Sequence, residues 1–465
     1  MANETNETKE AKAREKEEKQ ESKVGIGKLV LWNTRSVAVA IQTLTLTYLM
    51  IYCTDTLHIE PAWASIMLVA TKLLDGVTDT VAGFIVDRTQ TRWGKGRPYE
   101  VSVIGLWLAT WLLFSVPTGF GSAAKMVWIF CMYTMANSVF YTLLSANQNV
   151  YMIRAFKDTQ IVKLTSYGSV ITMLVAAAFN ILFPTAVTVV ATSASGWSSL
   201  MLMMAVPLAA IGILRMVFIP ERYQVGVAVN GQQEEKLKLR DIATLFKTNK
   251  YILIIAMMTL IFNLVCNMGV NTYYYSYIVG NLALAGVAAA AQMIAIPLAF
   301  CFPILLSKMS TIRLMFAGFI VAVVGYAINA VAGANMLLLV IAAIFTGAGT
   351  IPASMLSSLV ILECADFNEW KGNPRMEGTM SSLVGLGSKI GAAVGAGLLG
   401  ICLSAVGYNG DANITAASNM MIRALFGIVP MILYIITALS LRFYKLDKLT
   451  PQIKADIAAR RAGNN

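Results

Sequence analysis

The sequence predicts an all-α membrane protein with twelve transmembrane helices arranged in two six-helix bundles. Three observations support this fold class: the composition, the spacing of apolar segments and the placement of basic residues in the loops. Of the 465 residues, 57% are hydrophobic and 13% are charged, whereas a soluble domain carries about 25% charged residues. So few polar side chains cannot cover a chain of this length in water, which excludes two or three soluble domains.

Apolar stretches long enough to cross a bilayer, about 20 residues each, recur along the chain. Six precede a polar central stretch and six follow it. Their approximate ranges are 28–53, 61–86, 100–120, 124–148, 163–192 and 198–219, and then 249–279, 284–308, 310–332, 335–363, 378–406 and 417–443. An even number of spans places both ends of the chain on one side of the membrane.

Lysine and arginine are concentrated in alternate loops, and the opposite loops contain little more than Lys125. Cytoplasmic loops carry the excess of these residues, so both termini are predicted to be cytoplasmic in a multi-pass protein of the plasma (inner) membrane. The same placement relates the net charge of +11 to topology and argues against a nucleic-acid partner. The basic loop residues are Arg88, Arg92, Lys95, Arg97, Arg154, Lys157, Lys163, Arg222, Lys236, Lys238, Arg240, Lys247, Lys308, Arg313, Lys371 and Arg375.

These segments divide the chain into five regions. We expect a cytoplasmic N-terminal tail over 1–27, a first bundle over 28–219, a central cytoplasmic loop over 220–248, a second bundle over 249–443 and a C-terminal tail over 444–465. A six-plus-six division suggests two bundles around a central cavity with a substrate near the midplane. Another twelve-helix fold remains the alternative.

The second apolar segment carries charges that are expensive at membrane depth. Lys72, Asp75 and Asp79 recur at spacings of three and four, so they share one helix face, and Thr78 lies on the same side. Carboxylate and hydroxyl oxygens suit a small hard cation, which predicts a cation site at Asp75, Asp79 and Thr78. Without a cation, repulsion between the carboxylates would let protons compete. The alternative is an inert Lys72–Asp75 pair, which would leave Asp79 uncompensated.

The eleventh predicted span, 378–406 (helix 11), carries Lys389 far from either of its ends, within a glycine-rich run. A lysine that reaches for the membrane surface would lie near a helix end, so Lys389 is expected to pair with Asp75 or Asp79 or to donate to substrate oxygens. A purely structural pairing is the alternative. The glycines around it permit close helix approach or bending of the helix; they are Gly385, Gly387, Gly391 and Gly395.

Other polar features are weaker signals. Four tyrosines in helix 7 are suited either to stacking on a sugar ring or, more commonly, to an aromatic belt at the membrane interface. Arg35 is expected to be a loop-end charge near the cytoplasmic start of helix 1. The tyrosines are Tyr273, Tyr274, Tyr275 and Tyr277.

No enzyme is indicated. The six cysteines are scattered singly and His58 is the single histidine, so neither a disulfide framework nor a metal-ligand spacing is present. There is no phosphate-binding glycine loop, and nothing resembles a channel selectivity filter. We therefore expect no cofactor other than a coupling ion.

Three segments together resemble the glycoside–pentoside–hexuronide:cation symporters, the relatives of melibiose permease in the major facilitator superfamily. TKLLDGVTDTVAGFIVDRTQTRWGKGRPYE, ending at Glu100, resembles helix 2 and its following loop in that family. ECADFNEWKGNPRMEGTMSSLVGLGSKIGAAVGAGLLG, starting at Glu363, resembles the loop before helix 11 and helix 11 itself. YLMIYCTD, ending at Asp55, resembles the end of helix 1. The resemblance spans nearly the whole chain and implies the major facilitator fold.

The resemblance also implies a coupling-ion site. The two helix-2 carboxylates of the family fall on Asp75 and Asp79, and its helix-4 threonine falls on Thr134. Coupling to Na⁺ at Asp75 and Asp79 is therefore implied, with H⁺ or Li⁺ as substitutes. The family's helix-11 lysine falls on Lys389, and its basic residue one turn before the first acid falls on Lys72.

The sugar site of the family matches less well. The helix-1 aspartate of melibiose permease-like members becomes Val39, the helix-4 aspartate becomes Asn137, the stacking tryptophan becomes Tyr141 and the helix-5 arginine becomes Gly168. These departures argue against an α-galactoside and leave open which sugar or glycoside is carried. The expected substrate-binding residues are Lys389, Asn137, Tyr141, Lys72 and Tyr133.

The expected activity is cation-coupled symport of a sugar or glycoside by alternating access, carried out by a functional monomer in the lipid bilayer. The alternative is an exporter or antiporter of another small organic solute within the same superfamily. Ion pairs are expected to close the cytoplasmic side. The residues expected in this cytoplasmic gate are Asp87, Arg88, Arg92, Arg97, Glu363, Asp366 and Arg375.

Overall fold

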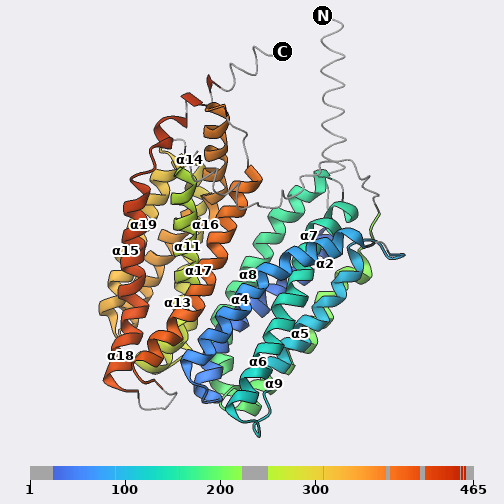
Figure 1. The fold of residues 1–465 in the computed structure, drawn as a ribbon, viewed down its shortest axis with the longest axis vertical. Helices are drawn as coiled ribbons and strands as arrows, with labels where there is room; N and C mark the ends of the chain where they lie inside the picture. Colours follow the sequence, from blue (N-terminus) through green and yellow to red (C-terminus); the bar gives the residue numbers. More distant parts are fainter. Residues whose placement is uncertain are drawn as a thin grey trace, which may run out of the picture. The chain divides into compact units, whose positions relative to one another are not determined.

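The computed structural model describes residues 25–456 apart from 90, 157, 223–249, 307, 373–376, 409–413, 451 and 454. Throughout this part of the chain the secondary structure is helical, and the only β-type pairing is an isolated bridge between Thr91 and Gly94. The all-α prediction is thereby confirmed. Figure 1 shows long helices joined by short connections.

The first half of the chain forms six helical segments, several of them interrupted by a π-helical or 3₁₀ turn. In order they are α2 (Ile26–Thr45) with the turns to Thr56; α4 (Pro61–Arg88); the turn Arg97–Val101 with α5 (Ser102–Leu113); α6 (Ser122–Thr134), the π-helical turn Met135–Tyr141 and α7 (Thr142–Ala155); α8 (Asp158–Val190); and α9 (Ala194–Phe218).

The second half forms six more. They are α11 (Lys250–Asn267) and α12 (Val270–Tyr273) with the π-helical turn Tyr274–Ile278; α13 (Leu284–Met293), the turn Ile296–Cys301 and α14 (Phe302–Leu306); α15 (Thr311–Ala332); α16 (Met336–Trp370); α17 (Glu377–Ala405); and α18 (Ala416–Arg423), the π-helical turn Ala424–Ile428 and α19 (Val429–Leu441).

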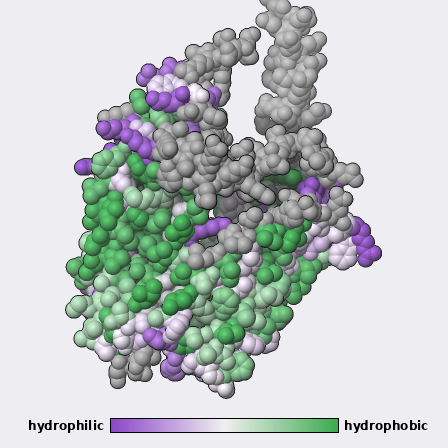
Figure 2. Space-filling view, viewed as in Figure 1, coloured by the Kyte–Doolittle hydropathy of each residue, from purple (hydrophilic) through white to green (hydrophobic). Residues whose placement is uncertain are grey.

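These twelve segments coincide with the twelve predicted spans. Within the described residues, nine helical stretches are long and apolar enough to cross a membrane. The other three predicted spans contain α4, α5 and α13. Large apolar side chains such as Trp63, Val189 and Leu337 are more than half exposed, and hydrophobic residues cover much of the visible helical surface in Figure 2. A surface of this kind is stable against lipid rather than water.

The chain forms two compact units whose limits differ from the predicted bundles. Unit 1 runs to Leu46 and includes 74–179 and 189–230, and unit 2 comprises 47–73, 180–188 and the chain from 231 onward. The end of the first helical segment, the start of α4 and a short part of α8 therefore pack with the second half. The predicted division at the central loop, residues 220–248, stays a prediction.

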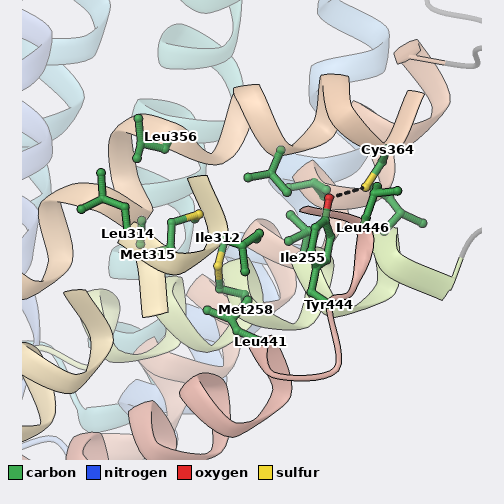
Figure 3. Packing of buried hydrophobic residues seen from close by; sticks show 14 of the residues in the cluster. Ile255, Met258, Ile312, Leu314, Met315, Leu356, Cys364, Leu441, Tyr444 and Leu446 are labelled. Atoms are coloured by element: carbon green, nitrogen blue, oxygen red, sulfur yellow. Dashed lines mark hydrogen bonds between the residues drawn. The ribbon is translucent and has the colours of Figure 1, made fainter. Parts of the chain in front are cut away.

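Each unit has its own packed core. In unit 1, Leu106 and Trp107 of α5 pack with Ala38 of α2. In unit 2, residues of α11, α15, α16 and α19 form a cluster that includes Met258 and Tyr444, and Figure 3 shows part of it. There the Tyr444 hydroxyl lies 3.5 Å from the Cys364 sulfur.

Glycines decide how closely α17 approaches α11. A Cβ on Gly387, Gly391 or Gly395 would lie 2.1–2.7 Å from a backbone carbonyl oxygen of α11, namely those of Ala256, Leu260 and Leu264. Only glycine allows this distance, so the predicted close approach is confirmed for these three positions. A Cβ on Gly385 would meet no described atom within 4 Å, so Gly385 is not part of this contact.

Candidate functional site

Asp75 lies in α4, in unit 1, where it contacts the segment that contains α6 and α7. The half-buried Asp75 carboxylate accepts a hydrogen bond from the Ser138 hydroxyl at 2.5 Å. Ser138 lies in the π-helical turn Met135–Tyr141 and is almost completely buried. A π-helical turn shifts the register of the helix by one residue, and such turns are frequent at functional sites.

Two further hydroxyl-bearing side chains, Thr134 and Thr78, lie within one helical turn of Ser138 and Asp75. Thr134, one turn before Ser138, has a buried Oγ1 with no hydrogen-bond partner among the described residues. The Thr78 hydroxyl donates to the carbonyl oxygens of Leu74 and Asp75, each at 3.2 Å. The side chain of Asp79 lies outside the described residues. A carboxylate with neutral hydroxyl oxygens is the ligand chemistry that a small hard cation prefers.

The two predicted lysines belong to unit 2. Lys72 is half-buried in the first part of α4, and Lys389 is exposed on α17. Lys389 is two residues from Gly387, about 200° around the helix, so it lies opposite the glycine face that contacts α11. The predicted pairing of Lys389 with Asp75 or Asp79 stays a prediction.

A pocket of about 430 Å³ lies in unit 1, where α2 and the segment leading into α7 each contribute one helix face. This volume is within the range of small-molecule sites. Tyr141, predicted to contact substrate, lines the pocket and is 38% exposed. Val39, at the position of the family's helix-1 aspartate, lines it as well. The full lining is Arg35, Ser36, Val39, Ala40, Thr43, Leu44, Tyr141, Leu144, Ser145, Gln148 and Ala176.

The other predicted substrate residues of this helix do not line that pocket. Asn137 is half-buried, and its side-chain amide donates to the Tyr133 carbonyl oxygen at 3.4 Å. Tyr133 itself is buried. Of the predicted substrate-binding residues in unit 1, only Tyr141 therefore lies at the pocket wall.

Arg35, predicted to be a loop-end charge, is a buried residue of the pocket wall. It is 5% exposed, so that prediction was wrong. The reason is that α2 begins at Ile26, which places residue 35 about 14 Å along the helix. Its guanidinium donates to the Leu144 carbonyl oxygen at 2.7 Å and to the Gln148 side-chain oxygen.

Behind Arg35 lies a buried ionic network. Arg215 of α9 donates to both oxygens of the Glu100 carboxylate, at 2.6 and 2.5 Å, and neither side chain is exposed. Asn147 of α7 donates to the same carboxylate at 2.8 Å. The Arg35 Nε lies 3.6 Å from Glu100 Oε2. The network thus connects α2, α7 and α9 with the turn Arg97–Val101 that precedes α5.

We call Arg35, Glu100, Arg215 and Gln148 the arginine cluster. From the sequence, Arg35 was predicted only as a loop-end charge, and no role was predicted for Glu100, Arg215 or Gln148. A signal was present, because charges inside apolar segments are functional hypotheses by default, the rule that identified Lys389. Their mutual contacts come from separate helices and could not be inferred from spacing along one helix.

A second polar cluster lies in unit 2, at the predicted outer end of the helices. The Asp55 carboxylate accepts hydrogen bonds from the hydroxyl groups of Thr54 at 2.6 Å, Tyr277 at 2.6 Å and Tyr408 at 2.7 Å. The hydroxyls of Tyr277 and Tyr408 are 2.8 Å apart, and those of Thr54 and Tyr273 are 2.7 Å apart. We call this group the aspartate–tyrosine cluster.

Burial and, next, the nearby Asp55 charge raise the pKa of Tyr408 well above its ordinary value of 10. Tyr408 therefore stays protonated and donates. Tyr273, Tyr274 and Tyr275 are at most 3% exposed, so the expectation of an interfacial aromatic belt is wrong for these three.

The predicted gate residues that the structure describes are held within their own units. The Arg97 guanidinium donates to the carbonyl oxygens of Met216 at 2.6 Å and Val217 at 3.1 Å, at the end of α9. The Glu221 carboxylate, for which the sequence predicted no role, accepts hydrogen bonds from the backbone amides of Lys95, Gly96 and Arg97. The loop after α4 is thereby fixed to the end of α9.

For the remaining predicted gate residues, the structure shows few contacts or does not describe the side chain. Arg92 is exposed and its guanidinium lies 5.7 Å from the Trp93 ring. Glu363 of α16 accepts from the Thr311 hydroxyl at 3.1 Å, and Asp366 is half-buried on the same helix. The side chains of Asp87 and Arg88, and the whole of Arg375, lie outside the described residues. The cytoplasmic gate stays a prediction.

Comparison with known proteins identifies the family. Residues 36–448 match the family model described as MFS/sugar transport protein. The isoprimeverose transporter of Lactiplantibacillus pentosus is 26% identical over 440 residues, which is 91% of this chain and 89% of the relative. The lactose permease of Leuconostoc lactis is 24% identical over 422 residues, covering 84% of this chain and 63% of the permease.

Solved structures agree on the fold. The nucleoside transporter NupG superposes with a TM-score of 0.63 at 15% identity, covering 90% of this chain and 99% of that one. A bacterial homologue of the human lysosomal transporter Spinster gives 0.63 at 13% identity, covering 92% and 97%. These structures confirm the major facilitator fold. The family model and the curated relatives confirm the predicted symporter resemblance and the prediction that the protein is a transporter and not an enzyme.

Proposed function

Because this chain belongs to the MFS/sugar transport protein family, we propose that it is a cation-coupled sugar symporter of the plasma membrane, with Na⁺ as the first candidate ion. The observation that carries the proposal is the presence, in one compact unit, of a carboxylate–hydroxyl group suited to a cation and a largely apolar pocket of sugar size with a few polar groups in its wall. Lysine- and arginine-rich loops support cytoplasmic termini. We further propose that the protein functions as a monomer in which the two predicted bundles move as rigid bodies.

The cation site that we propose is built on Asp75, with Asp79, Thr78 and Thr134. A buried hydroxyl without a hydrogen-bond partner costs about 1–3 kcal/mol, and a bound cation would relieve that cost at the Thr134 oxygen. Neutral hydroxyl oxygens coordinate Na⁺, whereas a proton needs only one carboxylate. The oxygen set therefore favours Na⁺, and H⁺ stays the second candidate.

The pocket between α2 and α7 is the proposed sugar site. Sugars offer hydroxyl groups along their edges and apolar C–H faces, and the pocket has both kinds of wall. Ser145 and Gln148 supply polar groups, Val39 and Leu144 supply apolar contact, and the exposed Tyr141 ring can lie against a pyranose face.

Alternating access requires an outer contact that opens and closes in each cycle. The aspartate–tyrosine cluster joins Asp55 of the first half of the chain to Tyr277 and Tyr408 of the second half. Opening toward the outside would separate these groups, and water can replace hydroxyl hydrogen bonds at little net cost. Each cation moving through 100 mV supplies about 2.3 kcal/mol, enough for roughly 50-fold accumulation.

The test is uptake by proteoliposomes of a panel of labelled glycosides, pentoses and uronides, with an inward Na⁺ gradient, an inward H⁺ gradient or none. We expect Na⁺-stimulated accumulation of at least one sugar, lost in Asp75→Asn and kept in Asp447→Asn, a matched change at a carboxylate that binds Ser310. Uptake driven by H⁺ alone would reassign the ion. Absence of sugar uptake under every gradient would favour an exporter of another small solute.

A further inference from the structure

The arginine cluster contains more positive than negative charge. Two guanidinium groups, those of Arg35 and Arg215, share the single Glu100 carboxylate. Its other polar partners, Asn147 and Gln148, are neutral amides. A buried charge without a counter-charge is unfavourable in the low dielectric of the membrane interior, so the location of the excess charge matters.

The Glu100 carboxylate pairs more closely with Arg215 than with Arg35. It makes both short hydrogen bonds to Glu100, and its guanidinium lies over the rings of Trp32 at 4.2 Å and Tyr151 at 5.2 Å. Cation–π contacts of this kind stabilise a desolvated guanidinium further. The charge of Arg215 is therefore compensated on all sides by the protein.

Arg35 is compensated less well. Its two described hydrogen bonds go to neutral acceptors, the Leu144 carbonyl and the Gln148 amide. Its Nε has no hydrogen-bond partner among the residues that the structure describes. A guanidinium has five N–H donors, so Arg35 can bind a further acceptor without releasing these two. The excess positive charge of the arginine cluster thus lies at Arg35.

Of the three charged residues in the arginine cluster, Arg35 lines the α2–α7 pocket, whereas Glu100 and Arg215 do not. No carboxylate is present in the pocket lining among the described residues. Gln148, which accepts from both arginines, holds the Arg35 guanidinium beside the lining groups Tyr141 and Ser145. The pocket therefore combines sugar-compatible polar and apolar walls with one buried positive charge that shares its single counter-charge, Glu100, with Arg215.

We infer that the substrate of this pocket is an acidic sugar, one that carries a carboxylate, and that Arg35 is the residue that selects it. This inference rests on the proposed function, since it names the class of sugar taken by the proposed site. A planar carboxylate matches the guanidinium fork and supplies the charge that Glu100 alone does not. The sugar hydroxyls then face Tyr141, Ser145 and Gln148.

The competing explanation is that the arginine cluster only connects α2, α7 and α9 with the turn before α5. A structural role predicts that changing Arg35 lowers stability and all transport equally. A selecting role predicts a change in the ratio between acidic and neutral substrates, which a structural role would leave unchanged. The ratio is therefore the quantity to measure.

The experiment compares uptake of labelled methyl glucuronide and methyl glucoside, which differ only in a carboxylate against a hydroxymethyl group. In wild-type proteoliposomes we expect the glucuronide to be preferred by about 10-fold or more. Arg35→Gln should lower the acid-to-neutral ratio by roughly 10- to 100-fold, the range for a hydrogen bond to a charged group. Arg35→Lys, which keeps the charge without the fork, should lose less.

Arg313→Gln is the matched control, because Arg313 is an exposed arginine that pairs with Asp447 in unit 2. It should leave the ratio unchanged. A wild-type protein that takes the glucoside as well as the glucuronide would overturn the inference, even if Arg35→Gln did not fold. So would an unchanged ratio in Arg35→Gln. Na⁺-driven uptake of neutral sugars alone would refute the inference and leave the proposed function standing, whereas absence of any sugar uptake would remove both.

Discussion

The arginine cluster of unit 1 and the aspartate–tyrosine cluster of unit 2 place a carboxylate in apolar helical surroundings in different ways. Glu100 is fully buried and is held by two guanidinium groups. Asp55 is half-buried and is held by three hydroxyl groups. The first cluster connects helices within the first half of the chain, and the second joins the two halves.

The difference in partners has an energetic consequence. Removing one partner from a buried ion pair costs about 3–5 kcal/mol, because the remaining charge stays in a low dielectric. A hydroxyl hydrogen bond contributes about 1 kcal/mol net, since water replaces it when the groups separate. Charge-paired contacts therefore suit permanent architecture, and hydroxyl-paired contacts suit surfaces that separate during a transport cycle.

The largest expected effect comes from breaking the ion pairs. Glu100→Gln keeps an oxygen acceptor but leaves Arg35 and Arg215 without a counter-charge, so we expect a loss of about 3–5 kcal/mol of unfolding free energy. Thermal unfolding of the purified protein in detergent measures it. Glu60→Gln, an exposed acid that accepts from Ser404, is the control. An unchanged midpoint in Glu100→Gln would contradict the assigned role of the pairs.

Asp75 provides the next test, because it accepts a hydrogen bond from the Ser138 hydroxyl. In Asp75→Asn the amide oxygen still accepts that hydrogen bond, so stability should change by less than about 1 kcal/mol. Cation-driven accumulation should nevertheless fall from roughly 50-fold to about 1-fold, because the charge that binds the cation is lost. Equal accumulation by the wild type, Asp75→Asn and Asp79→Asn would refute the cation assignment.

A smaller effect is expected at the aspartate–tyrosine cluster. Tyr408→Phe removes the bond to Asp55 and the contact with Tyr277, each worth about 0.5–1.5 kcal/mol, and should favour the open outer side. Cys53 is buried beside Thr54, so in a variant that keeps only this cysteine its labelling by a membrane-impermeant thiol reagent should speed up about 2- to 10-fold. A variant that keeps only Cys364, buried in the core of unit 2, should be unaffected. Equal Cys53 labelling with and without Tyr408 would argue against a moving contact.

The smallest effect is a pH dependence. The pKa of Tyr408 is raised in the folded protein, so its contribution to stability is present below about pH 10, the pKa of an exposed tyrosine, and falls only above it. Cys53 labelling, corrected for the intrinsic pH dependence of thiol reactivity with the Tyr408→Phe variant, should therefore be constant from about pH 7 to pH 10. A step within that interval would mean that another group controls the cluster.

Much of the fold could be predicted because its signals are local. A span is recognised from its own hydrophobicity, and all twelve predicted spans contain helical segments. The glycine-rich run around Lys389 was predicted to permit close helix approach, and three of its four glycines contact α11. Asp75 and Tyr141 were found from the cost of charge in a membrane and from a family resemblance, and each lies beside a polar group or pocket.

The misses share one cause. Ser138, Glu221 and Gln148 are ordinary polar residues along the sequence, and their importance depends on a partner in another helix. Arg35 was misassigned because its distance from the helix start, and not its position in the sequence, decides whether it can reach water. Periodicity shows which face of a helix a residue occupies, but not which helix covers that face.

By itself, the sequence determined that this protein is an all-α membrane protein and which acids in the second predicted span are too costly to be incidental. Both follow from transfer free energies, which each residue carries wherever it lies. The tertiary structure decided that Glu100 is shared between two arginines, that Arg35 lines a pocket and that Asp55 is held by tyrosines from the second half of the chain. Those facts depend on distances between helices, and electrostatic and hydrogen-bond energies change steeply with distance.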